Sequence, residues 1–528
     1  MFASVIISFY NKVRTNFWAV GLSSCSAALA LISNRSGVGW SWDSTDYVAV
    51  GTNIANGRGL LDVTGLPMTV RPPGLSVLIA AGISVGLSVN LFLLLLNATC
   101  AFIVVTVTFA LLQRALTNRT IIIATTAFVA FSPALLWQYS MAWSEPPFLA
   151  VLLIAMFISP QKMSYTKAAL MPLLMAALFF IRYVGPVFAV ALTISSLFIN
   201  RKQLGLIRSA VINFMGFAIS FVPCWLWLIR NRQIDGTLTG ARAPGGGSLI
   251  DPLKTLTGTL GTWVLAKPFE GGIYMSWSDY PDSAKFAGMS FLIIFVGLSI
   301  IIAAKKFKTT KFKTAKFKIN ERTNLNDQNV DVLISSATIS ILYICFSAYR
   351  FVHWELGPLD NRMIIPIYVP IIILVAIAVE QSITNQKQIR LIIGASFIVL
   401  FGLHLTSVTK DALAFGNDGR HWSGKGFQEL PIHEFVKTLP AKSLLLSNQP
   451  QQLFSVSKRP PVFNQYQIDA AQNRRCSHRY FVWYNTLYND GTPNTESMPQ
   501  GATLIFNDSW GTIFDLGLCR DDINFYWP

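Results

Sequence analysis

Charged side chains are scarce in this sequence. Asp, Glu, Lys and Arg make up 13% of the 528 residues, whereas a soluble globular protein carries about 25%. Acids are the scarcer sign, with 26 Asp and Glu against 42 Lys and Arg. The deficit excludes a soluble protein of this length, and it makes any acid beside an apolar run a candidate for chemistry.

Cysteine and histidine patterns typical of a zinc site are also missing, because no CxxC or Cys/His spacing occurs. Two of the six cysteines, Cys476 and Cys519, lie in the polar tail. They could pair as a disulfide if this tail lies outside the cytoplasm. The other four fall in apolar runs and are predicted to be small packing residues: Cys25, Cys100, Cys224 and Cys345.

Long apolar runs are the main feature that is present. Hydrophobic residues make up 52% of the chain. Runs of roughly 17 to 22 residues recur along the first four fifths, the length at which a helix crosses a bilayer. The first run, 17–33, has no small-residue cleavage site after it, so we expect it to be retained. The sequence predicts a mainly α, polytopic helical membrane protein.

The net charge of +16 reflects Lys and Arg in the short loops between spans, as the positive-inside rule requires. No basic and aromatic module accompanies this charge, so we expect no nucleic-acid partner. If every basic loop is placed inside, the chain has about eleven spans, a cytoplasmic N-terminus and an outer C-terminus. The apolar piece 74–87 must then lie along the outer interface or dip in and out. The expected location is the bacterial inner (plasma) membrane.

Two domains are predicted. Residues 1–408 form the transmembrane domain, with a first outer loop at 34–90 that includes helices next to the membrane and another outer loop at 230–285. Within the latter, Trp263, Tyr274 and Trp277 are predicted to form an interfacial aromatic belt, with the lining of an acceptor cleft as the alternative. Residues 409–528 are polar and mixed, with short strand-like runs at 480–483 and 502–506. They predict a small extracytoplasmic α/β domain.

Under this topology the notable ionisable residues beside the spans all fall on the outer face. Arginine offers a rigid fork of donors that suits phosphate oxygens. Carboxylates in the same cleft can accept a proton from an attacking hydroxyl or hold a divalent ion. The set therefore predicts a reaction on a lipid phosphate presented from the membrane, and it comprises Asp43, Asp46, Arg71, Glu145, Arg182, Arg230, Arg350, Asp360 and Arg362.

Many of these residues stand in motifs that occur in a fixed order over roughly residues 15 to 405. The ordered set resembles the GT-C membrane glycosyltransferases, in the branch of the protein O-mannosyltransferases and the lipid A aminoarabinose transferase. The tail after 409 resembles no family of known activity. The motifs are DSTDY (43–47), ANGRG (55–59), RPPGLSVLIA (71–80), WSEP (143–146), RYVGP (182–186), PCWLWLIRNRQIDG (223–236) and NRMIIP (361–366).

The resemblance implies roles for the acids. Asp43 takes the position of the catalytic aspartate, the general base that deprotonates the acceptor. Asp46 takes the position of the acidic neighbour of that aspartate. Its role could also be purely structural, to hold the loop or to pair with an arginine. Glu145 matches the acid at the outer end of the third span, although Ser-Glu-Pro-Pro is also a good helix start, so a capping role stays open.

The resemblance also implies the reaction. The donor is a sugar, hexosyl or pentosyl, on a polyprenyl phosphate, and single displacement inverts its configuration. The acceptor is an extracytoplasmic glycan, lipid or protein. Arg71, Arg182 and Arg362 are the first candidates to neutralise the leaving phosphate, with Arg230 and Arg350 next.

A divalent metal is in doubt at this site. In some relatives an acid precedes the Arg-Pro of the first loop and helps to bind a metal, but this chain has Val70 there. His353 and Glu355 are the one local pair that could hold a metal, and a lone His-x-Glu in a loop is usually structural. No cofactor is otherwise expected.

Three other functions are compatible with a polytopic protein, and one of them is a non-catalytic scaffold whose tail recruits a partner, which the intact acids disfavour. A transporter or flippase of a lipid-linked saccharide often shows inverted repeats and polar residues at mid-membrane, whereas here charges gather at one face and no repeat is evident. Transfer of phosphoethanolamine would call for a nucleophilic Thr or Ser with several histidines around it, a cluster that this sequence lacks.

Overall fold

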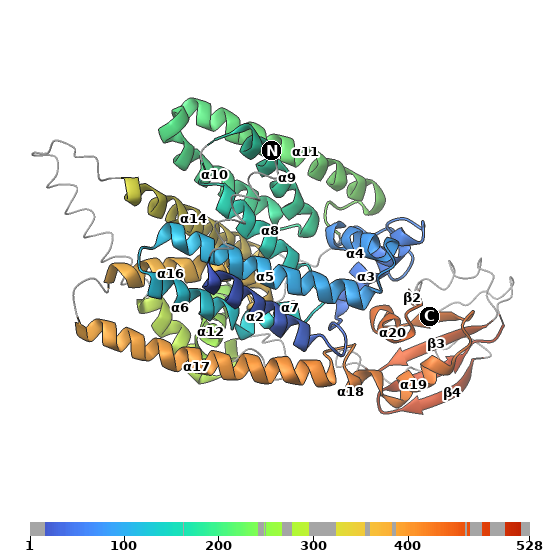
Figure 1. The fold of residues 1–528 in the computed structure, drawn as a ribbon. Helices are drawn as coiled ribbons and strands as arrows, with labels where there is room; N and C mark the ends of the chain where they lie inside the picture. The colour runs from blue at the N-terminus through green and yellow to red at the C-terminus, as the bar shows by residue number, and fades with distance from the viewer. Residues whose placement is uncertain are drawn as a thin grey trace, which may run out of the picture.

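The apolar runs form helices, as predicted. The computed structural model describes residues 16–161, 163–240, 248, 250–266, 277–294, 324–353, 359–382, 387–459, 462–464, 478–485 and 502–518. Figure 1 shows long helices running side by side, with a small sheet beyond one end of them. The helices of the bundle are α2 (Phe17–Ser33), α5 (Val89–Ala115), α6 (Arg119–Ala130), α7 (Pro133–Tyr139), α8 (Glu145–Ile158), α9 (Tyr165–Ile181), α10 (Gly185–Leu204), α11 (Leu206–Asp235), α14 (Asn324–His353), α16 (Tyr368–Ser382) and α17 (Lys387–Asp418).

Several of these helices are suited to lipid. Five described helices are long and apolar enough to cross a membrane, or six if α6 and α7, bent by 46° at their break, count as one span. Only 17% of an 18-residue apolar stretch of α11 is buried inside the protein, and only 11% of such a stretch of α17. Exposed apolar surface of this extent is rare on soluble proteins. The polytopic helical fold is therefore confirmed, while the count of eleven spans stays a prediction.

Loops that were predicted to lie inside gather at one end of the bundle. Arg114, at the end of α5, donates from Nη1 to the carbonyl oxygen of Phe157 in α8 (2.5 Å). The backbone amides of Thr117 and Asn118 donate to Glu380 Oε1 in α16 (2.8 and 2.6 Å). These bonds join the ends of three helices, and the candidate site lies at the opposite ends of α5 and α8.

The first outer loop folds into two short helices, α3 (Trp42–Ala55) and α4 (Gly74–Ser84). They pack closely, because a Cβ added at Gly51 would lie 2.7 Å from Ile79 Cγ2. With eleven residues, α4 is about 16 Å long, which is half of the roughly 30 Å that a span must cross. Its length agrees with its exclusion from the predicted spans.

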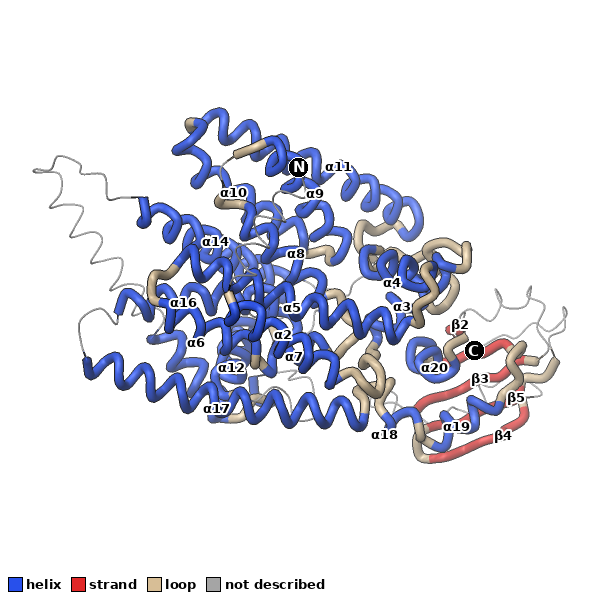
Figure 2. The backbone as a smooth tube through the Cα atoms, viewed as in Figure 1, coloured by secondary structure: helices blue, strands red, loops and turns tan. Residues whose placement is uncertain are grey.

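The tail forms the predicted α/β structure. Its sheet has the order β2-β1-β3-β5-β4, in which β1 is parallel to β2 and β3, and β5 is antiparallel to β3 and β4. Figure 2 shows these strands at the end of the molecule, beyond α17. The elements are α18 (Lys425–Gln428), α19 (Pro431–Thr438), β1 (Leu444–Ser447), α20 (Pro450–Ser457), β2 (Val462–Asn464), β3 (Arg479–Tyr484), β4 (Thr503–Asp508) and β5 (Gly511–Asp515).

The tail and the first outer loop share one apolar core. The Trp40 ring, just before α3, stacks on Phe454 of α20 with 6.0 Å between centroids. Lys458 Nζ lies 3.5 Å from the Trp40 ring centroid, and burial lowers the pKa of Lys458 to about 8. The amide of Val462 donates to the carbonyl oxygen of Val63 (2.9 Å). The α/β domain is thus anchored on the loop that carries Asp43.

The segment after α17 is fixed by Arg420. Its guanidinium lies between two rings, 3.4 Å from the Trp137 centroid and 3.7 Å from that of Phe415. Its Nη1 donates to Ser140 Oγ (2.8 Å). Since Trp137 and Ser140 stand at the end of α7, this contact ties the tail to the bundle as well.

The cysteine predictions have mixed outcomes. Cys100 and Cys224 are buried, as expected of packing residues. Cys25 and Cys345 are exposed on helix surfaces, so the packing prediction is wrong for these two. The disulfide candidates, Cys476 and Cys519, lie outside the described residues.

Replacing Trp40 with Ala is expected to destabilise the contact between tail and first loop. Truncation of a buried aromatic residue costs roughly 3–5 kcal/mol, and Trp40 is only 4% exposed. We expect a lower melting temperature of the purified protein in detergent and faster proteolytic release of the tail. Trp510→Ala is the matched control, because Trp510 is 50% exposed. Equal effects of the two variants would contradict the shared core.

Candidate active site

Two acids of the first loop face the same way because of their spacing. Helix α3 begins at Trp42 after Ser41, whose backbone is extended. Asp43 and Asp46 then lie three residues apart, which places them on one face of the helix. Asp43 also lies in the first turn, where the helix dipole favours a negative charge.

Arg71 bridges these two acids. Its Nη1 lies 2.7 Å from Asp43 Oδ1, and its Nε lies 2.9 Å from Asp46 Oδ2. The segment that carries Arg71 packs against the end of α9, just before Arg182. A Cβ added at Gly74 would lie 2.4 Å from the carbonyl oxygen of Phe180. Only glycine allows this approach of α4 to α9.

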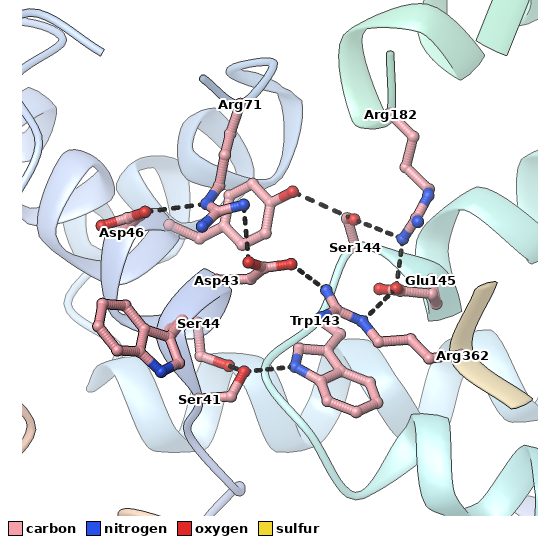
Figure 3. Close-up of polar contacts among 12 residues, drawn as sticks. Ser41, Asp43, Ser44, Asp46, Arg71, Trp143, Ser144, Glu145, Arg182 and Arg362 are labelled. Atoms are coloured by element: carbon pink, nitrogen blue, oxygen red, sulfur yellow. Dashed lines mark hydrogen bonds and ion pairs between the residues drawn. The ribbon is translucent and has the colours of Figure 1, made fainter. Parts of the chain in front are cut away.

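Arg362 continues the chain of ion pairs into the bundle. Its Nη2 binds Asp43 Oδ2, and its Nε lies 2.7 Å from Glu145 Oε1. Glu145 Oε1 also accepts from Arg182 Nη1. Figure 3 shows the resulting order, Asp46–Arg71–Asp43–Arg362–Glu145–Arg182, in which acids and arginines alternate. The structure therefore brings six of the predicted site residues together.

Aromatic and hydroxyl side chains support this chain of charges. The Arg362 guanidinium lies 4.3 Å from the ring centroid of Trp143, and Trp143 Nε1 donates to Ser41 Oγ (2.7 Å). Ser144 Oγ accepts from Arg182 Nη1 and from the Tyr47 hydroxyl, both at 3.2 Å. The WSEP motif thus contributes three consecutive residues to the site.

A cleft of about 170 Å³ opens beside these ion pairs. Of the residues that line it, four are arginines and one, Asp43, is an acid, so its wall carries a net positive charge. Arg350 is the fourth arginine, with its guanidinium 5.7 Å from the ring centroid of Phe346. The charged and aromatic lining residues are Asp43, Arg71, Arg182, Arg350, Arg362, Tyr47, Tyr183, Tyr343, Phe346 and Phe351.

Asp46 and Glu145 stand behind the cleft and do not line it. The Glu145 side chain is fully buried, which is tolerated because two guanidiniums bind it. Ser144 makes no side-chain cap at the start of α8. In this structure Glu145 therefore pairs with arginines, in addition to lying in the first turn of its helix.

Arg230 lies away from the cleft lining. Its Nη1 donates to the carbonyl oxygen of Met68 (2.8 Å), and its guanidinium lies 4.5 Å from the Trp227 ring centroid. The geometry gives it a part in fixing the strand-like segment before Arg71. Its predicted role in binding the donor phosphate has no counterpart in the cleft described here.

A buried network around Asn231 was missed by sequence reasoning. Asn231 Nδ2 donates to the Tyr183 hydroxyl (2.9 Å), which in turn donates to the carbonyl oxygen of Thr69 (2.6 Å). Thr69 Oγ1 also donates to Asp235 Oδ2 (2.5 Å). The network fixes the residues just before Arg71. The RNRQID sequence at the end of an apolar run was the available signal.

Trp263 corrects the predicted aromatic belt. It is 5% exposed and lies in α12 (Ile250–Leu265), where its Nε1 donates to Asn361 Oδ1 (2.7 Å). Asp360 Oδ1 accepts from the amide of Met363 (2.9 Å) and caps α15 (Asn361–Ile364). Both contacts fix the turn that carries Arg362. Tyr274 and the side chain of Trp277 lie outside the described residues.

The residues of the site suit an anion better than a divalent cation. Both oxygens of Asp43 already bind guanidinium groups, and position 70 is a valine. His353 is exposed and stacks on Tyr349, 4.2 Å between centroids, while Glu355 lies outside the described residues. Within the described part of the chain, no group of three or more His, Cys, Asp or Glu is placed to hold a metal.

The two acids of α3 differ in pKa, because Asp43 is held by a second guanidinium, that of Arg362, and Asp46 is not. Burial would raise the pKa of Asp43, but the guanidiniums of Arg362 and Arg71 outweigh it and hold this pKa well below its usual range. Burial raises the pKa of Asp46 to about 6 despite the attraction of Arg71, and the negative charge of Asp62 adds to the rise. Asp43 is therefore ionised at neutral pH, whereas Asp46 changes its protonation state about one pH unit below neutral.

Comparison with known proteins places this fold. No family model and no curated protein matches the sequence. Among solved structures, the chain is similar to ArnT from Cupriavidus metallidurans bound to undecaprenyl phosphate, with a TM-score of 0.60 at 12% identity over 94% of this chain and 98% of that one. The apo state of the same protein gives 0.58 at 12% identity, over 94% and 97%.

A weaker likeness is to the oligosaccharyltransferase of Archaeoglobus fulgidus in complex with Zn and sulfate. Its TM-score is 0.46 at 11% identity, over 87% of this chain and 68% of that one. The likeness to ArnT, a lipid A aminoarabinose transferase, extends over nearly the whole of both chains. The chain thus has the polytopic fold of ArnT, which is the fold that the resemblance in its motifs predicted.

The raised pKa of Asp46 makes stability depend on pH. Since the folded protein favours the protonated acid, this group stabilises the fold below about pH 4, and the contribution is lost as the pH rises through 6. We expect the melting temperature of the wild type to fall relative to Asp46→Asn between pH 4 and 7, by an equivalent of roughly 2–3 kcal/mol. Parallel curves for the two proteins would contradict the shift.

Proposed function

We propose that this protein is a membrane glycosyltransferase that moves a sugar from a polyprenyl-phosphate donor to an acceptor outside the cytoplasm. The observation that carries the proposal is the cleft, where four arginines and Asp43 meet beside apolar helices. A lipid phosphate has the matching chemistry: an anionic head for the arginines and an apolar chain for the membrane. The fold supports it, since an ArnT structure of this fold is bound to undecaprenyl phosphate.

The arginines serve the leaving group. In the reaction the bond between the anomeric carbon and the phosphate oxygen breaks, and its electron pair stays on the phosphate. Arg71, Arg182, Arg350 and Arg362 line the cleft and stabilise the charge that gathers there, because donors fixed in advance lower the barrier where charge develops. A phosphate monoester is a good leaving group, so no general acid is required.

Asp43 serves the acceptor. An acceptor hydroxyl attacks the anomeric carbon from the face opposite the phosphate, which inverts the configuration, and its proton passes to a carboxylate oxygen of Asp43. Asp43 is the one acid among the described residues that line the cleft. Asp46 and Glu145 contribute through the arginines that they bind.

The alternative hypothesis, a transporter or flippase of a lipid-linked saccharide, has less support. A substrate path would require polar groups at the middle of the membrane, between halves of broken helices. The ion pairs described here lie where α3, α8 and α15 begin. We accordingly place the reaction at the extracytoplasmic end of the bundle, with the α/β domain on the same side.

Loss of Asp43 tests the chemistry directly. The gene is deleted in its host, the envelope glycan, glycolipid or glycoprotein that loses a sugar is identified by mass spectrometry, and variants are reintroduced. We expect Asp43→Asn to lower the rate at which the modified product forms by about 10²- to 10⁴-fold, the range for loss of a general base. Asp418→Asn, on an exposed acid at the end of α17, is the control at equal expression and should restore it. Full restoration by Asp43→Asn would remove Asp43 from the mechanism.

A further inference from the structure

Arg71 and Arg362 hold Asp43 in the same manner. Each places an Nη group on a different oxygen of Asp43, and each places its Nε on a second acid, Asp46 for Arg71 and Glu145 for Arg362. Figure 3 shows the two arginines approaching Asp43 from opposite sides. Asp43 lines the cleft, whereas neither anchoring acid does.

This division of contacts has a mechanical consequence. Nε lies at the base of the guanidinium, next to the aliphatic stem, whereas the Nη groups lie at its far end. An arginine anchored through Nε can therefore redirect its Nη groups toward a new anion in the cleft without losing its first partner. Because the guanidinium is planar and rigid, little freedom is lost in forming the new contact.

We propose that Asp43 occupies the Nη groups of Arg71 and Arg362 in place of the donor phosphate, and that the arriving phosphate takes them over. In this exchange Asp46 and Glu145 are positioning residues, which keep the two guanidiniums at the cleft through Nε. The inference rests on the proposed function, since it takes the phosphate to be that of the sugar donor.

The exchange would couple donor binding to activation of the base. In the structure each oxygen of Asp43 accepts from a guanidinium, and these two positive charges make Asp43 a weak base. Once the phosphate draws the Nη groups of both arginines away, both carboxylate oxygens lose their guanidinium partners and Asp43 becomes a stronger base. Binding is then ordered, with the donor first, and an acceptor is deprotonated only when a sugar is in place.

A simpler electrostatic view makes a different prediction. If the acids act only through their charge, removing either Asp43 or Asp46 should strengthen phosphate binding. Under the exchange, loss of Asp43 removes the competitor and strengthens binding. Loss of Asp46 instead frees Arg71 to turn its whole fork onto Asp43 as a bidentate pair, which strengthens the competitor and weakens phosphate binding.

The test compares Asp43→Ala with Asp46→Ala, a matched pair that removes the same group from one helix. Binding of undecaprenyl phosphate to the purified full-length chain in detergent is measured, with undecaprenol, which lacks the phosphate, as the ligand control. We expect roughly tenfold tighter binding for Asp43→Ala and roughly tenfold weaker binding for Asp46→Ala, a range typical of single close charge contacts. Undecaprenol should bind all three proteins alike.

The outcomes separate this inference from the proposed function. A wild type that binds undecaprenyl phosphate no better than undecaprenol would overturn both. A wild type that prefers the phosphate, with both variants shifted in one direction or neither shifted, overturns the exchange and leaves the function standing. If Asp46→Ala does not give folded protein by its melting curve, Asp46→Asn replaces it. Its neutral oxygen holds Nε more weakly, so roughly threefold weaker binding is expected.

Discussion

Asp43 joins two arginines that come from distant parts of the chain, and the architecture of the site depends on that junction. The Arg362–Asp43 pair connects residues 319 positions apart, and the Arg362–Glu145 pair connects residues 217 apart. A charge withdrawn from water is costly unless it is paired. The start of α15 and the first outer loop are consequently held together by charge at the end of an otherwise apolar bundle.

The surrounding structure keeps these charges in register. Trp263 and Asp360 fix the turn of Arg362, the network around Asn231 fixes the segment before Arg71, and Trp40 fixes α3 to the tail. Each support comes from a different region, including the long loop after α11 and the C-terminal domain. The α/β domain therefore has a structural part in the site, because it packs on the loop that presents Asp43.

The fold class and most of the charged residues of the cleft could be predicted from the sequence, because composition, loop charge and ordered motifs report them directly. Asp43, Arg71, Arg182, Arg350 and Arg362 were predicted and do line one cleft. The ion pairs between these residues, the contact of Arg230 with Met68 and the burial of Trp263 could not be predicted. They depend on contacts between segments far apart in the chain. The metal pair and the disulfide candidates fall partly or wholly outside the described residues and stay predictions.

The proposed reaction requires that the arginine cleft beside Asp43 receives the phosphate of a polyprenyl donor. The most direct measurement is an experimental structure of the protein with undecaprenyl phosphate bound in a lipid nanodisc. We expect phosphate density within hydrogen-bonding distance of the Nη groups of Arg71, Arg182 and Arg362, with the polyprenyl chain leaving toward the membrane. Phosphate bound elsewhere, with the Nη groups of Arg71 and Arg362 still paired to Asp43, would contradict this claim.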